Sequence, residues 1–182
     1  MPGRPSPAEL AASRDKTIPD ILAPGLRVVF AGINPGLYSA ATGWHFARPG
    51  NRFWPALHQS GFTPRQFRPA EQELLLDLGL GITNIAARAT ARADELTAAE
   101  LRAGADILRT KIGQLNPAWL AVVGLTAYRT AFGDPGAVVG ERETPIAETR
   151  IWVLPNPSGL NAHWAGPRLA EAFAELRMTA MG

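Results

Sequence analysis

The sequence VVFAGINPG, residues 28–36, joins a continuous apolar run to a loop made rigid by proline and glycine. Four consecutive apolar residues before such a loop are typical of a strand that is buried on both faces of a parallel sheet. The same arrangement returns near the other end of the chain, where IWVL (151–154) runs directly into PNPSGL (155–160). Ligands of open α/β sheets bind beyond the carboxyl ends of the strands, where the strand order reverses. The two loops, which carry Asn34 and Asn156, are therefore expected to face each other across one crevice.

Strands and helices are expected to alternate along the rest of the chain. A capping box, Thr97 with Glu100, starts the longest predicted helix. Residues 86–96 lack apolar periodicity and are expected to form a loop, and residues 17–25 are expected to hold one helical turn. Alternation of this kind predicts a parallel sheet covered by helices on both faces. The strands are predicted at 27–31, 81–85, 119–123 and 151–154, and the helices at 51–60, 69–78, 97–114, 125–132 and 167–178.

The length of 182 residues suits one domain with a full hydrophobic core. Residues 1–16 contain three prolines in a polar setting and are expected to form a mobile or partly helical arm, followed by a single domain over 17–182. The chain has no cysteine, so disulfides and cysteine-ligated iron–sulfur clusters are excluded. Its three histidines are scattered, which argues against a histidine metal site. No cofactor is expected.

Hydropathy and charge give weaker indications of location and partners. No segment reaches the roughly 20 apolar residues that a membrane span requires, and the N-terminus lacks the apolar core of a signal peptide. A cytoplasmic location without a membrane partner is therefore expected. The formal net charge of +2 permits binding to DNA but does not predict it.

Together the two loops resemble the motif pair of the uracil-DNA glycosylase superfamily. Asn34 stands where many members have Asp and Asn156 where many have His, a pair that resembles the mismatch-specific uracil/thymine-DNA glycosylase branch. The segment GWHFARPGNRFW, residues 43–54, is similar to the same branch. The resemblance extends over about residues 26–177.

This resemblance implies a three-layer αβα sandwich with a short, mostly parallel central sheet. It implies a glycosylase that flips uracil out of double-stranded DNA, preferentially from G·U pairs, and also accepts some modified pyrimidines. The base would be released by hydrolysis to leave an abasic site, in a nucleoid-associated role and as a monomer. The chain has only Lys16 and Lys111, and neither lies in a motif, so a lyase step through a Schiff base is not expected.

The resemblance assigns the chemistry to two amides. Asn34 would orient the attacking water, because an amide cannot take a proton at neutral pH. Asn156 would contact a pyrimidine carbonyl and stabilise the departing anion. Asp94 is a separate hypothesis, since a carboxylate from the 86–96 loop could act as the base that Asn34 cannot be. Turn geometry alone is the alternative explanation for both asparagines, and a solvated loop is the alternative for Asp94.

Other positions would hold the base and the DNA. Phe46 would stack on the flipped base, with the backbone of Ile33 and Phe46 at the base edge; a core phenylalanine is the alternative. Gly36 would leave room for C5-substituted pyrimidines, although a positive φ would also explain glycine there. Ser39 would line the pocket or hold a phosphate. Ser158 would contact a phosphate of the DNA, and Gly159 and Leu160 would form a wedge that enters the helix. Asn161 and His163 are candidates for contacts with the orphaned guanine. Phosphates would also be held by four arginines: Arg48, Arg52, Arg65 and Arg68.

Two other functions remain open on the sequence. A small-molecule nucleoside hydrolase would use the same crevice without needing the apolar Leu160. A damage-binding module without catalysis would explain why Asn34 replaces a carboxylate.

Overall fold

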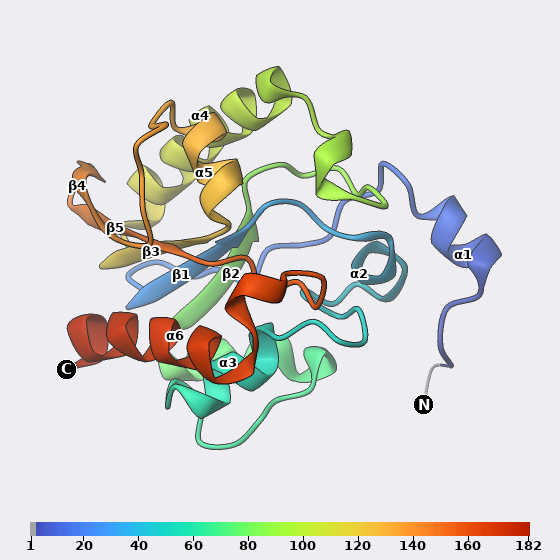
Figure 1. Cartoon of the computed structure of the whole chain (residues 1–182), viewed down its shortest axis with the longest axis horizontal. Helices are drawn as coiled ribbons and strands as arrows, with labels where there is room; N and C mark the ends of the chain where they lie inside the picture. The colour runs from blue at the N-terminus through green and yellow to red at the C-terminus, as the bar shows by residue number, and fades with distance from the viewer. Residues whose placement is uncertain (1–2) are drawn as a thin grey trace.

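A five-stranded sheet forms the centre of the computed structural model, which describes residues 3–182 (Figure 1). The strand order is β2-β1-β3-β5-β4, with β1, β2, β3 and β5 parallel and β4 antiparallel to β5. Each parallel strand is short and almost wholly buried, as its apolar sequence predicts. The strands are β1 (Val28–Gly32), β2 (Leu80–Asn84), β3 (Trp119–Val123), β4 (Gly140–Ile146) and β5 (Thr149–Leu154).

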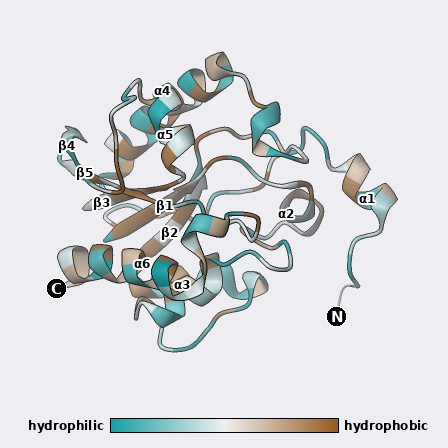
Figure 2. Ribbon diagram, viewed as in Figure 1, coloured by the Kyte–Doolittle hydropathy of each residue, from teal (hydrophilic) through white to brown (hydrophobic). Residues whose placement is uncertain are grey.

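Helices cover both faces of the sheet, so the predicted αβα sandwich is confirmed (Figure 1). On one face, α3 (Phe53–Gln59) and α6 (Gly166–Met181) enclose a core rich in aromatic rings, among them Phe30, Phe53 and Phe173. On the other face, α4 (Ala98–Leu115) and α5 (Leu125–Ala131) enclose an aliphatic core. The hydropathy colouring shows the apolar residues concentrated on the strands between the two helical layers (Figure 2). Among the described residues, no helix combines the length and apolarity that a membrane span would need.

The helix starts and ends follow local sequence. The Thr97 side chain accepts a hydrogen bond from the Glu100 N–H, and the Glu100 side chain accepts one from the Thr97 N–H. The predicted capping box therefore starts α4. The same helix ends where Asn116 takes a left-handed conformation with φ of 50°.

The helix predicted at 69–78 is confirmed with the same bounds, and it is a 3-10 helix. Two other local expectations were wrong. Residues 17–25 hold no helical turn and instead run alongside β2 through a bridge between Ile21 and Ile82. The antiparallel strand β4 was missed, because its sequence GERETPI is charged and contains proline, as suits an exposed sheet edge.

Two short helices lie in the N-terminal part of the chain, one before β1 and one after the loop that follows β1. Helix α1 (Pro7–Ala12) lies in the N-terminal arm and contacts α2 (Leu37–Thr42). The arm is joined to the loop after β2 by paired backbone bonds, Asp15 N–H to the Ala89 carbonyl at 2.9 Å and Ala89 N–H to the Lys16 carbonyl at 2.8 Å. The first two residues of the predicted arm lie outside the described residues.

The order β2-β1-β3 places a reversal of strand order between β1 and β3. The loops that follow β1, β2 and β5 therefore gather at one edge of the sheet, the edge at which this class of fold binds ligands.

Candidate active site

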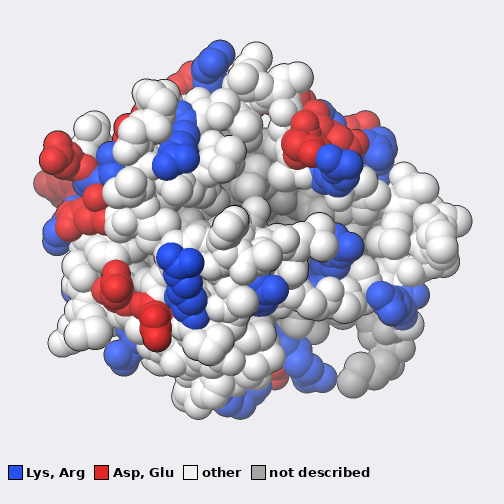
Figure 3. Space-filling model, viewed as in Figure 1, with Lys and Arg blue, Asp and Glu red and all other residues white. Residues whose placement is uncertain are grey.

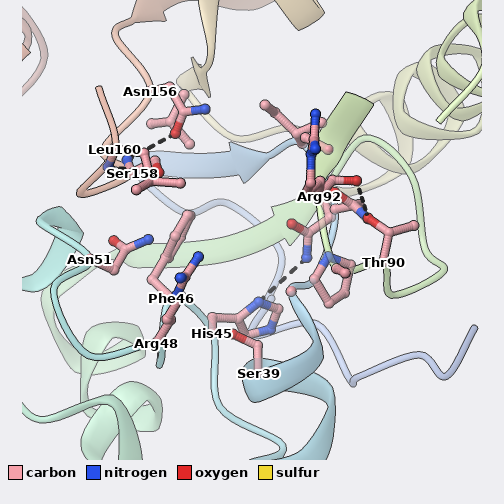
Figure 4. Close-up of a pocket in the computed structure, with 18 of the residues that line it drawn as sticks. Ser39, His45, Phe46, Arg48, Asn51, Thr90, Arg92, Asn156, Ser158 and Leu160 are labelled. Atoms are coloured by element: carbon pink, nitrogen blue, oxygen red, sulfur yellow. Dashed lines mark hydrogen bonds between the residues drawn. The ribbon is translucent and has the colours of Figure 1, made fainter. Parts of the chain in front are cut away.

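A cavity of about 360 Å³ opens at this edge. The loops after β1, β2 and β5 supply its walls, and the segment between α2 and α3 closes the remaining side (Figure 4). The space-filling view shows the hollow between white, uncharged surface and a group of charged side chains (Figure 3). Nearly all residues predicted for the site line this cavity: Ile33, Asn34, Gly36, Ser39, Phe46, Asp94, Asn156, Ser158 and Leu160.

The amide of Asn34 is held in one orientation by the loop after β2. Its Nδ2 donates to the Arg88 carbonyl at 2.9 Å and to the Thr90 hydroxyl oxygen at 2.8 Å. The Thr90 hydroxyl donates its own proton to the Arg92 carbonyl, so towards Asn34 it can only accept. Both amide protons of Asn34 are thus used, and Oδ1 has no partner within residues 3–182. Asn34 presents a hydrogen-bond acceptor to the cavity.

The amide of Asn156 is held through its oxygen, whereas that of Asn34 is held through its nitrogen. Its Oδ1 accepts the backbone N–H of Ser158 at 3.0 Å, which is the asparagine turn considered above as an alternative. The Nδ2 group has no partner in the described chain and remains available as a donor. Figure 4 shows Asn156 and Ser158 joined on one side of the cavity, with Thr90 and Arg92 on the other. The turn therefore gives Asn156 a defined donor face.

Phe46 stands in a tightly held segment, yet its own backbone is free. The neighbouring N–H groups donate to side chains, His45 to Gln72 Oε1 at 2.8 Å and Ala47 to Ser39 Oγ at 3.2 Å. Neither the N–H nor the carbonyl of Phe46 has a partner within the described residues. Its φ of 52° is unusual for a bulky residue and costs on the order of 1–3 kcal/mol, a strain that is typical of functional sites.

The Phe46 ring is half-buried and stacks on Phe53 with ring centroids 4.0 Å apart. Room for it depends on Gly32, where a Cβ would lie 3.2 Å from the Phe46 ring and 2.6 Å from Asn84 Oδ1. The ring is therefore both a core contact, as the alternative held, and a wall of the cavity.

Gly36 is not a conformational requirement. Its φ of −74° is open to any residue, so the positive φ considered above is wrong. A Cβ at this position would have no heavy atom within 4 Å. Glycine here leaves space at the cavity that a side chain would fill.

Ile33 and Ser39 line the cavity and are fixed by contacts with neighbouring segments. The Ile33 carbonyl accepts the Ala86 N–H at 2.9 Å, and its side chain packs where a Cβ of Gly124 would lie. Ser39 is buried, and its hydroxyl oxygen accepts the Ala47 N–H, so it fixes the Phe46 segment.

Among the lining residues that were not found from the sequence, His45 and Asn84 form a linked pair. His45 is buried, and its Nε2 lies 2.8 Å from the Pro19 carbonyl. A carbonyl can only accept, so Nε2 carries the proton and Nδ1 faces the Asn84 amide nitrogen at 3.5 Å as an acceptor. Burial lowers the pKa of His45, against smaller opposing effects from Pro19 and Asp20, and keeps the ring neutral. No sequence pattern joins these two positions, because strand β2 brings Asn84 to the loop that holds His45.

Asp94 lies at the rim of the cavity, and its side chain is 63% exposed. It forms an ion pair with Arg92, its neighbour in the same loop. Asp94 is the only carboxylate among the described residues that line the cavity.

The loop 157–164, here called the wedge loop, projects beside the cavity. Leu160 at its tip is 79% exposed, the highest value among the exposed large apolar side chains. A Cβ at Gly159 would lie 2.6 Å from the Gly50 carbonyl oxygen, so glycine is needed for the close contact between these two loops. Asn161 Nδ2 donates to the Asn156 carbonyl at 3.1 Å, and Ser158 Oγ accepts the Leu160 N–H at 3.3 Å.

The four arginines proposed to grip phosphates differ in their surroundings. Arg48 lines the cavity and forms no ion pair with the described residues. Arg65 and Arg68 both pair with Glu71, and the Arg65 guanidinium lowers the pKa of that carboxyl to about 2. Arg52 donates to backbone carbonyls of the wedge loop.

The loop after β2 is fixed by charge as well as by its backbone. Arg88, whose carbonyl holds Asn34, pairs through its guanidinium with Glu100 at 2.6 Å and with Asp15 at 3.1 Å. The hydrogen bond from Arg88 lowers the pKa of Glu100 to about 2. Within residues 3–182 no group of three or more His, Asp or Glu side chains is placed to hold a metal ion.

Comparisons with known proteins bear on the family and the fold. A family model described as the uracil DNA glycosylase superfamily matches residues 19–177. The fold is similar to the solution NMR structure of a provisionally assigned uracil DNA glycosylase from Methanosarcina acetivorans. That likeness has a TM-score of 0.61 at 17% identity and covers 90% of this chain and 97% of that chain, so it concerns the fold. On the family match over most of its length, this chain belongs to the uracil DNA glycosylase superfamily, whose members are DNA repair hydrolases that excise uracil.

Proposed function

We propose that the protein is a monofunctional DNA glycosylase of the mismatch-specific branch. It excises uracil, preferentially from G·U pairs, together with some modified pyrimidines, and leaves an abasic site. The observation that carries the proposal is the opposite polarity of two fixed amides that line one cavity. Asn34 offers an acceptor and Asn156 offers a donor.

The acceptor and the donor match two needs of the reaction, which are to orient the attacking water and to stabilise the departing base. Water attacks C1′ of the deoxyribose while the C1′–N1 bond breaks, and the bonding electron pair leaves with the pyrimidine. An acceptor such as Asn34 Oδ1 orients a water proton, although it cannot remove it. A donor such as Asn156 Nδ2 stabilises the negative charge that develops on the base carbonyl. The water oxygen ends on C1′ as a hydroxyl that keeps one proton, the other proton passes through the solvent to the released base, and the products are free uracil and an abasic sugar.

The cavity walls suit a flipped pyrimidine. The Phe46 ring can stack on the base, and stacking of this kind is worth about 1–3 kcal/mol whatever the base. The unpaired N–H and carbonyl of Phe46 can read the edge of the base. The space at Gly36 admits a C5 substituent. The enzyme would then select its substrates by how easily each base leaves the duplex, and a mismatched base costs the least to extrude.

The wedge loop suits the duplex. Leu160 offers an exposed apolar side chain that can replace the flipped base in the stack. The Ser158 hydroxyl proton is free to donate to a phosphate, because Oγ is engaged only as an acceptor. The amide nitrogen of Asn161 is used, so its Oδ1 remains to accept from the N–H groups of an orphaned guanine. The protein is proposed to act as a monomer.

Asp94 remains the candidate for a general base. Its position at the cavity rim favours the role, and its exposure and its pairing with Arg92 oppose it. An Asp94→Asn variant decides the matter: a large loss of single-turnover rate would assign the role, and a wild-type rate would remove it.

The proposed function is tested by base release from matched oligonucleotides that carry G·U, A·U, single-stranded U and G·T. Release of uracil, fastest from G·U among the duplexes, is the expected result. Binding without release would instead indicate a damage-binding module. Release only from free deoxyuridine would indicate a small-molecule hydrolase.

Gly36→Tyr is expected to narrow the substrate range. A tyrosine side chain would fill the open space at this position and exclude pyrimidines with a C5 substituent. Uracil release should continue while thymine and C5-modified cytosines are lost, as measured by competition between substrates in one reaction. Gly36→Ala, which adds one methyl group in open space, is the matched control and should behave as wild type.

A further inference from the structure

Polar contacts tie the wedge loop to the body of the protein at one principal residue, Arg52. The Arg52 backbone N–H donates to the Pro157 carbonyl at 2.9 Å. Its guanidinium donates through Nη1 to the carbonyls of Asn161 at 2.8 Å and Trp164 at 3.1 Å, and through Nη2 to that of Gly159 at 3.1 Å. One planar cation therefore fixes the loop at three points, two of them on either side of Leu160.

The other hydrogen bonds of the loop are local. Leu160 and Asn161 donate their backbone N–H groups to Ser158, and the Asn161 side chain donates to Asn156 next to the loop. Within the described chain, the other residue that reaches the loop from outside is Arg168, which donates to the His163 carbonyl at 3.0 Å. Without the Arg52 guanidinium the tip of the loop keeps its internal turn but loses three of the hydrogen bonds that connect it to the rest of the domain.

Arg52 is itself well anchored and carries an uncompensated charge. It precedes α3, whose first two residues, Phe53 and Trp54, are 0% and 3% exposed. Among the described residues Arg52 forms no ion pair, whereas Arg65, Arg88 and other arginines have carboxylate partners. Its charge is directed to peptide carbonyls, and hydrogen bonds of this charge-assisted kind are stronger than neutral ones.

We infer that Arg52 is a positioning residue for base flipping, which holds the wedge loop so that Leu160 enters the duplex in a fixed direction. The inference rests on the proposed function. Extrusion of a base costs a few kcal/mol of stacking and pairing, and a loop that had to be ordered at that moment would add its own entropy cost. A loop already fixed by Arg52 avoids this second cost. Arg52 acts through Leu160 and has no contact with the base.

The guanidinium geometry is specific to arginine. A lysine ammonium is a single point of charge and cannot span three carbonyls with a planar fork. The backbone bond to Pro157 survives any substitution at residue 52 except proline. The Asn156 turn next to it should therefore persist in the variants. A loss of rate in these variants would then come from the wedge loop and not from a displaced Asn156.

The test compares single-turnover uracil release from a G·U duplex with release from the same strand alone, because a single strand needs no wedge. Arg52→Met is expected to slow release from the duplex by roughly 10- to 100-fold relative to the single strand. Arg52→Lys should recover only part of this loss. Arg177→Met is the matched control: it removes the same charge from an arginine that donates to a single carbonyl, that of Gly61, and should keep the wild-type ratio of duplex to single-strand rates.

A double-mutant cycle assigns the effect to the wedge. In a Leu160→Ala background, Arg52→Met should add little further loss on the duplex, because the side chain that Arg52 positions is already gone. Full additivity of the two losses, or an unchanged ratio of duplex to single-strand rates in Arg52→Met, would overturn the inference. If Arg52→Met does not fold, Arg52→Lys carries the same comparison. Failure of the wild type to release uracil from any substrate would refute the proposed function instead.

Discussion

Asn34 and Asn156 carry the same side chain but present opposite atoms to the cavity. The sequence predicts that both lie at strand ends, since each follows an apolar strand in a loop of proline and glycine. It does not predict which end of either amide is free. That choice depends on partners such as Arg88 and Thr90, which lie 54 and 56 residues beyond Asn34 and meet it only in the folded sheet.

Thr90 is expected to matter for rate because it orients the amide of Asn34. Its hydroxyl accepts from Asn34 and donates to the Arg92 carbonyl, so it selects the amide orientation that leaves Oδ1 free. Thr90→Val removes both hydrogen bonds of the hydroxyl. Loss of the one from Asn34, worth about 1 kcal/mol, should lower single-turnover uracil release by roughly 5- to 10-fold. Thr90→Ser keeps the hydroxyl and should retain the wild-type rate. Equal rates in the valine and serine variants would show that Thr90 does not orient Asn34.

At the scale of elements, the apolar strands and their end loops were predictable because burial on both faces leaves a clear signal. The elements that were missed or mistaken lack this signal: β4 is exposed and charged, and α2 has only six residues. The contacts of Arg52 with backbone carbonyls were also not predicted, because an arginine in a loop gives no indication of whether its donors face phosphates or carbonyls. His45 was missed for a similar reason, since its partners come from the 17–21 segment and β2.

The His45 network should make folding stability depend on pH. Burial lowers the pKa of His45 in the folded state below its unfolded value of about 6.5. As the pH falls below 6.5 the unfolded chain binds a proton that the folded chain resists, so this contribution to stability is complete above pH 6.5 and is lost towards acid. The loss at pH 5.5 is at most about 1.4 kcal/mol.

Urea unfolding at pH 7.5 and pH 5.5, for wild type and His45→Gln, measures this effect. The wild type should lose more unfolding free energy between the two pH values than the variant does. Glu71 and Glu100, with pKa values of about 2, lose their contributions only below about pH 4.5 and do not interfere. Parallel losses in the two proteins would contradict the assignment.

On the scale of the whole molecule, basic and acidic residues nearly balance, with a formal net charge of +2. On the face drawn in Figure 3, acidic side chains gather at the left and upper right, while basic side chains are spread across the face. DNA affinity is therefore expected to depend on the few arginines near the cavity that have no acidic partner, of which Arg48 lines the cavity itself.

Arg48→Gln is expected to weaken duplex binding and to reduce its dependence on salt. Loss of one phosphate contact should lower the slope of log Kd against log salt by about one unit. Fluorescence anisotropy with a G·U duplex over a series of salt concentrations measures the slope. Arg109→Gln serves as the control, because Arg109 lies on α4, is paired with Asp106 and lines a different cavity. An Arg48 slope equal to that control would show that Arg48 does not contact phosphate.

The measurement that bears most directly on the whole account is single-turnover uracil release from a G·U duplex by wild type and Asn34→Ala. Thermal melting and duplex binding are recorded for both proteins. The wild type is expected to release uracil and the variant to lose roughly 100-fold or more of that rate, with folding and binding retained, because the acceptor that orients the water is gone. Wild-type release by Asn34→Ala would contradict the central role of that amide, and no release by the wild type would contradict the proposed function itself.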